Sequence, residues 1–272
     1  VVDNASQDTT LEALETCKQS ENLPLDIISN KKNYGYAHAI NIGIRKALDD
    51  GYTYICVTNN DIIFEAGFFT QMLDDAQAHA IDALGVPASI SDQEIGFGYN
   101  LDTETYAPKK EASKYRKDMG ALMTFDPLPR IDFPHGGTIL FSRYFFENIG
   151  LYDHHLFFGG DELDFLYRVT AYNATHVPKI TCAVSLRSFF LLDNLTKHNS
   201  GHKIIKARGM LQGNARVLLK HKFTPFHPGL YKSQQSLITG LAKGRILRYL
   251  ALYMFALRGL VIESFKFYTS RI

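Results

Sequence analysis

Three acidic side chains stand within four positions in the stretch Gly159-Gly160-Asp161-Glu162-Leu163-Asp164. Neighbouring carboxyl groups raise one another's pKa, which suits a general base that takes a proton from a substrate. The two glycines would let a substrate approach. The alternative is an ordinary helix start, where capping and the helix dipole favour acidic side chains and Asp164 pairs with Arg168 four positions on. The stretch alone leaves both interpretations open.

A second polar cluster, Asn59-Asn60-Asp61, closes the apolar run that starts at residue 52. A carboxylate at the end of a buried strand can hold Mg²⁺ or Mn²⁺, hard ions that prefer oxygen ligands and bridge to phosphates. Asn and Asp also begin ordinary turns. Taken alone, the cluster favours the turn.

Two more polar segments lie near the N-terminus. Asp3, Asn4 and Ser6 form a polar turn after Val1 and Val2. The segment NKKNYGYAHAIN contributes a glycine and amides at the start of an expected helix, where phosphate or sugar can bind. Its members of interest are Asn30, Asn33, Gly35 and Asn41. An ordinary loop and helix cap would need the same residues, so this pattern is weak by itself.

The elements that must position these clusters alternate along the first sixty residues. We expect strands at Val1-Val2, 25–29 and 52–61, with helices at 7–19 and 36–50. This order predicts an α/β fold with a parallel sheet and right-handed crossovers. Ligands of such sheets bind beyond the carboxyl ends of the strands. Both Asp3-Asn4 and Asn59-Asn60-Asp61 fall at that edge.

The remainder of the chain is less regular. Residues 99–120 are polar and predict a surface loop, which we favour as a solvated insertion over a substrate lid. We expect a strand at 136–142, a short helix at 143–150, a helix from about Asp161, and short strands at 174–178 and 180–185. From about residue 203 the pattern is helical, and 230–268 is helical again.

The C-terminal apolar run, residues 249–257, is far shorter than the roughly 20 residues that span a bilayer. Basic residues flank it, so it could lie in a membrane interface or pack on the main domain, and the sequence does not separate these two.

Basic and acidic residues nearly balance, 29 against 28, which argues against a protein that works by coating nucleic acid. Three separated cysteines, without a CxxC pair, argue against a disulfide framework or zinc site.

The order of all these motifs carries a resemblance. The segments VVDNASQDTT, NKKNYGYAHAIN, VTNND and GGTILFSRYFFENIGLYDHHLFFGGDELDFLYR resemble the family 2 glycosyltransferases, which have the GT-A fold. GNARVLLKHKF is similar to a helix of bacterial rhamnosyltransferase-like members. The resemblance implies a Rossmann-like, mostly parallel sheet flanked by helices over residues 1–200, and a C-terminal helical extension over 201–272. In that family the VDN strand is the second, so the resemblance also implies that a first strand and helix are missing here.

The resemblance implies a role for each motif. Glu162, favoured over Asp161, would be the catalytic base, and Asp61 would hold Mg²⁺ or Mn²⁺ on the diphosphate. Asp3 would contact the nucleotide base. Gly136 and Gly137 would line the acceptor side, with Asp164 and Arg168 bracing the site. The donor-binding residues would be Asp3, Asn4, Ser6, Asn33, Gly35, Asn41, Asn59 and Asn60.

The implied function is an inverting transfer of a hexose from a nucleotide-diphosphate donor, dTDP-rhamnose or a UDP-sugar, to a saccharide or lipid-linked acceptor of cell-surface polysaccharide. Galactofuranosyl and glucosyl transfer stay open. We expect a bacterial cytoplasmic protein that can contact the inner face of the membrane and binds no nucleic acid. The alternatives are a degenerate sugar-nucleotide-binding module and a nucleotidyltransferase. A histidine metal ligand expected after the late strands is replaced by Ser188 and Phe189, with His198 and His202 further on.

Overall fold

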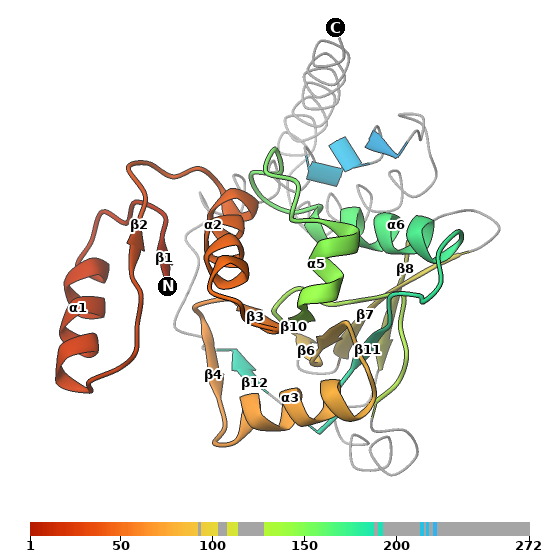
Figure 1. The fold of residues 1–272 in the computed structure, drawn as a ribbon, viewed down its shortest axis with the longest axis horizontal. Helices are drawn as coiled ribbons and strands as arrows, with labels where there is room; N and C mark the ends of the chain where they lie inside the picture. Colours follow the sequence, from red (N-terminus) through yellow and green to blue (C-terminus); the bar gives the residue numbers. More distant parts are fainter. Residues whose placement is uncertain are drawn as a thin grey trace, which may run out of the picture.

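The computed structural model describes residues 1–91, 94–102, 108–113, 128–187 and 190–192, together with Gly213, Asn214, Arg216, Val217, Lys220 and His221. Figure 1 shows the arrangement. The helices are α1 (Thr10–Ser20), α2 (Tyr36–Asp49), α3 (Phe68–Ala78), α5 (Arg143–Ile149) and α6 (Asp161–Asn173). The first strands are β1 (Val2–Asp3), β2 (Ile28–Ser29), β3 (Tyr54–Thr58), β4 (Ile62–Phe64), β5 (Ala83–Gly85) and β6 (Ala88–Ser91). The later ones are β7 (Glu94–Leu101), β8 (Pro108–Ser113), β9 (Phe133–Pro134), β10 (Thr138–Ser142), β11 (Cys182–Val184) and β12 (Phe190–Leu192).

The central sheet has the strand order β11-β5-β10-β3. The expected α/β class is confirmed, and β11 runs parallel to β5 as β1 does to β2. Strand β10 differs from the mostly parallel expectation because it is antiparallel to both β3 and β5. In the described residues between β5 and β10, the elements are strands. The chain leaves β5, forms β6, β7 and β8, and returns to the same edge, so the next strand runs backwards.

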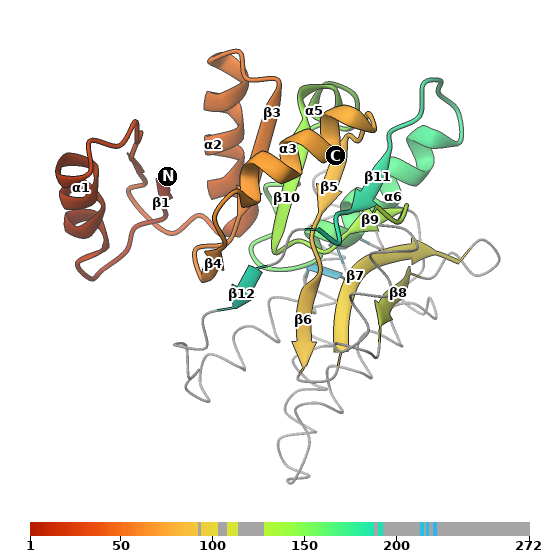
Figure 2. The ribbon, with the colours of Figure 1, turned by 90° about the horizontal axis from the view of Figure 1, so that it is seen from below.

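Helices cover both faces of this sheet (Figures 1 and 2). On one face α3 packs Phe68, Met72 and Ala76 against Leu140 and its neighbours. On the other face α2, α5 and α6 pack against Ile139 and Phe141. Successive β10 side chains therefore enter opposite cores, as the two-residue period of a strand buried on both faces requires.

The expected polar loop at 99–120 is wrong for the residues that form β7 and β8. These strands pair antiparallel, for example Tyr99 with Lys110, and β9 pairs with the other edge of β7. Strand β8 carries three consecutive charged residues, Lys109, Lys110 and Glu111, so its sequence shows no apolar alternation. Gly98 allows the crossing, since a Cβ there would meet Pro134 Cα at 2.7 Å. Residues 114–127 lie outside the described part.

The end of the chain is described only in part. A strand expected at 174–178 is wrong, because α6 ends in a turn and the Asn173 side chain bonds the backbone of Ile180. The strand expected at 180–185 is found as β11. Gly213, Asn214, Arg216, Val217 and Lys220 are helical, as expected. The helices expected at 230–268 and the residues Ser188, Phe189, His198 and His202 lie outside the described residues. Within the described part, no helix has the length and apolarity to cross a bilayer.

One amide fastens α2 to the segment that follows α5. Asn41 is 1% exposed. Its Nδ2 donates to the Tyr152 carbonyl at 2.8 Å, and its Oδ1 accepts from the Tyr152 N–H at 3.0 Å. Both ends of the amide are therefore used inside the protein. The expectation that Asn41 contacts a donor is not met by this arrangement, and the residue holds the backbone instead.

We predict that Asn41→Ala lowers the free energy of unfolding by about 2–4 kcal/mol, because two buried backbone groups lose their partner at roughly 1–3 kcal/mol each. Urea unfolding followed by circular dichroism measures this. Asn148→Ala is the matched control, since Asn148 is exposed and its bonds to Tyr144 and Tyr172 lie at the surface. An equal loss of stability in the two variants would contradict the assignment.

Candidate active site

Asn4 joins the two loops that follow β1 and β2. Its Nδ2 donates to Asn33 Oδ1 at 2.9 Å and to the Gly35 carbonyl at 3.2 Å. Its Oδ1 accepts from Asn30 Nδ2 and from the Tyr34 N–H, both at 3.1 Å. The amides predicted to bind a donor are therefore brought together at one strand edge. In this structure Asn4 and Asn33 bond mainly to each other and to the loop.

Asp3 lies at the same edge and is 4% exposed. Its carboxylate accepts from the Ser6 N–H at 3.2 and 3.3 Å, one distance for each oxygen. Its carbonyl accepts from the Asn30 N–H at 2.9 Å. The turn Asp3–Ser6 is thus built around the buried carboxylate, and it lies beside the Asn4 loop.

A close backbone contact joins this edge to the loop before α6. The Tyr36 N–H donates to the Phe157 carbonyl at 2.9 Å. Gly35 has φ +90°, and a Cβ there would lie 2.9 Å from Phe157 Cα and from its carbonyl oxygen. Only glycine fits such an approach in the left-handed region. The predicted donor segment and the predicted acidic segment therefore meet.

Tyr36 lies among the acids of two different motifs. Its hydroxyl donates to Asn59 Oδ1 at 3.0 Å. Burial raises the pKa of the Tyr36 phenol, and the negative charges of Asp161, Glu162 and Asp61 raise it further. These charges act on one hydroxyl only if they lie near it. The acids of both motifs therefore act on the Tyr36 phenol, and its hydrogen bond to Asn59 joins it to the motif that ends in Asp61.

Asp61 carries the feature that fits a divalent cation. Among the described residues its Oδ1 is buried without a hydrogen-bond partner. A buried unpaired carboxylate oxygen is costly unless something positive or donating meets it. The Asn59 N–H donates to the Gly137 carbonyl at 3.1 Å, which holds this residue in place, while Asn60 is exposed. An oxygen ligand at a sheet edge suits Mg²⁺ or Mn²⁺.

Another potential metal cluster consists of Asp153, His154 and His155, whose ligand atoms lie within 4.8 Å of one another. The Asp153 carboxylate already faces Lys220 at 3.3 Å and Arg216 at 3.4 Å. Two cationic side chains at this distance oppose a metal ion. Asp61 is therefore the better candidate.

Glu162 is held by groups from two other segments. Its Oε1 accepts from the Gly136 N–H at 2.6 Å, and His135 Nδ1 lies 3.8 Å away. Tyr99 of β7 bonds to the same carboxylate, whose charge is the main cause that raises the pKa of the Tyr99 phenol. The Glu162 side chain keeps 23% of its surface exposed. This carboxylate is fixed in place and still reachable.

Asp161 has a different environment from its neighbour. Burial, and then the charge of Glu162, raise the pKa of Asp161 to about 7. The expectation that adjacent acids raise a pKa here is met, although desolvation is the larger cause. The pair thus offers one carboxyl that titrates near neutrality and one that is held by hydrogen bonds.

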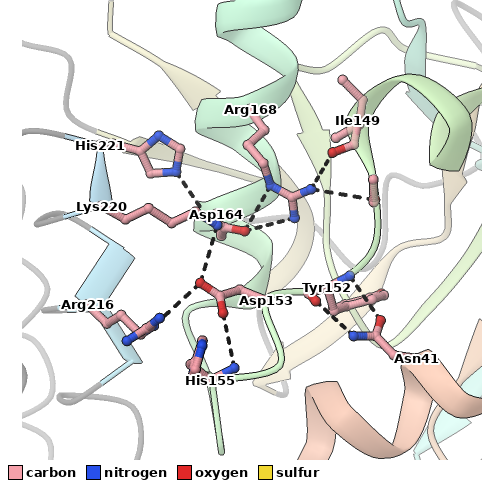
Figure 3. A network of polar contacts seen from close by, with 11 residues as sticks. Asn41, Ile149, Tyr152, Asp153, His155, Asp164, Arg168, Arg216, Lys220 and His221 are labelled. Atoms are coloured by element: carbon pink, nitrogen blue, oxygen red, sulfur yellow. Dashed lines mark hydrogen bonds and ion pairs between the residues drawn. The ribbon is translucent and has the colours of Figure 1, made fainter. Parts of the chain in front are cut away.

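Asp164 and Arg168 of α6 pair with each other within a network of polar contacts (Figure 3). Asp164 is fully buried, and its Oδ2 lies 2.9 Å from Arg168 Nε and 2.8 Å from Arg168 Nη2. Arg168 Nη1 donates to the Ile149 carbonyl at 2.6 Å. Burial alone would raise the pKa of Asp164, but the His221 hydrogen bond and the Arg168 and Lys220 charges hold it well below its usual range. These two residues link α6 to the backbone at the end of α5.

Sequence reasoning missed Tyr36, Tyr99 and His135. Tyr36 and His135 stand beside the motif glycines Gly35 and Gly136, so their positions next to a motif could have marked them as site residues. Tyr99 had no such signal in the sequence, because it reaches Glu162 only through the β7–β8 hairpin, which the sequence did not indicate.

Comparisons with known proteins show the family of this chain. Residues 1–150 match the sequence profile "Glycosyl transferase family 2". The match covers more than half of the chain, so this protein belongs to that family. A search among curated proteins gives no match.

Solved structures share the fold. GalNAc-T7 with UDP, GalNAc and Mn²⁺ superposes with a TM-score of 0.56 at 14% identity, over 94% of this chain and 47% of that one. The mannosyltransferase PcManGT from Pyrobaculum calidifontis, with GDP-Man and Mn²⁺, has a TM-score of 0.47 at 16% identity, and the match covers 99% of this chain and 73% of that one. S. aureus TarS 1–349 with UDP-GlcNAc has a TM-score of 0.43 at 13% identity, and the match covers 97% of this chain and 79% of that one. The chain has the GT-A fold and spans about half the length of the first of these proteins.

The raised pKa of Asp161 predicts a pH-dependent stability. Between about pH 4 and pH 7 the folded protein keeps a proton on Asp161 that the unfolded chain has released, so rising pH lowers the free energy of unfolding. Asp161→Asn does not titrate. In metal-free buffer its stability relative to the wild type should therefore increase by about 1–3 kcal/mol from pH 4 to pH 8. Urea unfolding at each pH measures this, with exposed Asp74→Asn as control. A difference that does not change with pH would contradict the prediction.

Proposed function

We propose that this chain carries the sugar-transfer site of an inverting glycosyltransferase. One observation supports it most. The predicted base Glu162 accepts from the Gly136 N–H at 2.6 Å, and the next carbonyl, that of Gly137, accepts at 3.1 Å from the N–H of Asn59, two positions before the predicted metal ligand Asp61. A donor diphosphate at Asp61 and an acceptor hydroxyl at Glu162 would then be neighbours, which direct displacement at the sugar carbon between them requires.

Each group has a defined task in this proposal. Asp61 would hold a bound Mg²⁺ or Mn²⁺, which supplies stabilisation of the negative charge on the diphosphate. Asp3 and the loop joined by Asn4 would receive the nucleoside. Tyr36 would keep Asn59 in place through its 3.0 Å hydrogen bond.

The chemical step is a single displacement. Glu162 takes the proton of the acceptor hydroxyl as that oxygen bonds to the anomeric carbon. The bond from that carbon to the donor phosphate oxygen breaks on the opposite side, so the configuration inverts. Glu162 is the proposed base because its exposed carboxylate is fixed 2.6 Å from the Gly136 N–H. Asp161 is less suited because burial disfavours its charged form.

The finer assignments belong to the same proposal. The motif order favours dTDP-rhamnose or a UDP-sugar as donor, and a saccharide or lipid-linked acceptor of bacterial cell-surface polysaccharide. Basic residues flank the apolar run 249–257, and they support contact with the inner face of the membrane. We also propose that residues 1–200 form the transferase domain and 201–272 its helical extension.

The donor can be identified by calorimetry. UDP-, dTDP- and GDP-sugars are titrated into the protein with Mn²⁺ and with EDTA. We predict binding with Mn²⁺ that weakens at least about tenfold, 1.4 kcal/mol, in Asp61→Asn, because the metal loses a charged ligand. Asp49→Asn is the control, since Asp49 is exposed on α2. Binding of no sugar nucleotide would favour the degenerate module, and release of diphosphate from a nucleoside triphosphate and a sugar phosphate would favour a nucleotidyltransferase.

The base assignment has its own test. Glu162→Gln should lower kcat by about 10²–10⁴-fold, the usual contribution of a general base, and leave the donor affinity unchanged. Gly136→Ala should do the same, because its methyl group would lie 2.5 Å from Glu162 Oε1. Glu12→Gln, an exposed change on α1, is the control. Initial rates of nucleotide release with an acceptor measure the effect. Normal turnover in Glu162→Gln would move the base role to Asp161.

A further inference from the structure

Two consecutive glycines form a hinge immediately before the candidate catalytic pair. Gly159 has φ +74° and Gly160 has φ +88°, and α6 begins at the next residue. No side chain caps this helix. Glycine has more backbone freedom than any other residue, so the chain itself does not fix the direction in which α6 starts. Something outside the hinge must hold the first turn, where Asp161 and Glu162 stand.

A segment more than fifty residues further on lies against this hinge. We call it the clamp segment, and its described residues are Gly213, Asn214, Arg216, Val217, Lys220 and His221. Gly213 touches the hinge backbone to backbone. A Cβ on Gly160 would lie 2.8 Å from the Gly213 carbonyl carbon, and a Cβ on Gly213 would overlap the Gly159 carbonyl. Val217 is 1% exposed and belongs to the core beneath α6.

Lys220 of the clamp segment contacts one acid on each side of the hinge (Figure 3). Its Nζ lies 2.8 Å from Asp164 Oδ1, in the first turn of α6, and 3.3 Å from Asp153 Oδ2, in the loop before the hinge. Both side chains are nearly buried, with 0% and 8% of their surface exposed. Ion pairs that are this buried are weakly screened and geometrically defined, unlike surface pairs.

The other groups around these two acids act on one side each. Arg168 and His221 contact Asp164, and Arg216 contacts Asp153. In the described part of the chain, Lys220 alone pairs with both carboxylates. Loss of its charge leaves each acid with another basic partner, so the fold can persist while the bridge is lost.

We propose that Lys220 is a positioning residue, which bridges Asp153 and Asp164 across the glycine hinge and thereby fixes the first turn of α6 and its two catalytic carboxylates. The catalytic part of this statement rests on the proposed function. The structural part does not. Lys220 contacts neither reactant in this scheme and acts through the placement of Asp161 and Glu162.

Hydrogen exchange tests the structural part directly. The Asp164 N–H donates to the Gly160 carbonyl at 2.9 Å, the first helical bond after the hinge. In Lys220→Met we expect exchange in the first turn of α6 to quicken by about tenfold or more, because local opening becomes easier. Lys220→Arg should restore the protection. Lys46→Met is the matched control, since Lys46 also contacts two acids, Asp26 and Asp50, at an exposed site.

A second variant keeps the test valid if Lys220→Met does not fold. Asp153→Asn is nearly isosteric and removes one end of the bridge, while Asp164 keeps Arg168 and His221. It should quicken exchange in the same turn. Unchanged exchange in both Lys220→Met and Asp153→Asn would overturn the proposal, as would an equal effect of Lys46→Met.

Kinetics test the catalytic part. Lys220→Met should lower kcat on the order of 10–100-fold, as small misplacement of a catalytic group does, while KM and the donor Kd stay unchanged. Lys220→Arg should recover most of the loss. A fall in donor affinity with normal kcat would overturn the positioning role. If the wild type transfers no sugar, the proposed function fails, and the exchange data still decide whether Lys220 holds the hinge.

Discussion

The placement of several carboxylates at one site is the constraint on which the rest of this site depends. Burial raises the pKa of the Tyr36 phenol, and the negative charges of Asp161, Glu162 and Asp61 raise it further. Like charges in a poorly solvated site repel one another. The protein limits this cost for Glu162 and Asp161 but not for Asp61. Glu162 receives a backbone N–H, Asp161 shifts its pKa upward, and Asp61 is left with one oxygen unpartnered. The three acids are therefore chemically distinct although they are neighbours.

The fourth acid, Asp164, shows the opposite solution. It is more deeply buried than the other three, yet its carboxylate is surrounded by Arg168, Lys220 and His221. Full pairing makes it ionised and inert, which suits a structural anchor. The first turn of α6 thus holds both the reactive acids and a neutralised acid that is fully buried. A single sequence motif, DELD, supplies both kinds because Asp164 is fully buried beside Arg168, whereas the Glu162 side chain keeps 23% of its surface exposed.

Much of this arrangement follows from the sequence, and the exceptions share a cause. The period of apolar residues predicted α2, β3, β10, α5 and α6, and the motif order predicted that polar clusters would meet at the strand edge. Local pattern could not show that β10 runs backwards, since that depends on the path of the chain between β5 and β10. The β7–β8 hairpin was missed because its charged residues hide the strand period. With it, the contact of Tyr99 with Glu162 was missed.

The interpretation of Asn41 illustrates the limit for single residues. An amide in the second turn of a helix looks the same in sequence whether it faces a ligand or a backbone segment 111 residues away. Only the packing of α2 against the segment after α5 distinguishes the two. Residues that bond at long range are therefore the least predictable part of such a site.

The reversed direction of β10 has a consequence for how the site tolerates change. Its neighbours β3 and β5 end at the edge where β10 begins, so the two glycines that enter β10 stand among the ends of other strands. Their backbone groups are used across the edge, with the Gly136 N–H on Glu162 and the Gly137 carbonyl on the Asn59 N–H. The length of the connector from β9 to β10 is thus fixed by the acids rather than by the core. An added residue there would leave the buried face of β10 in register but would turn the Gly136 N–H away from Glu162. This short connector therefore tolerates substitution better than insertion.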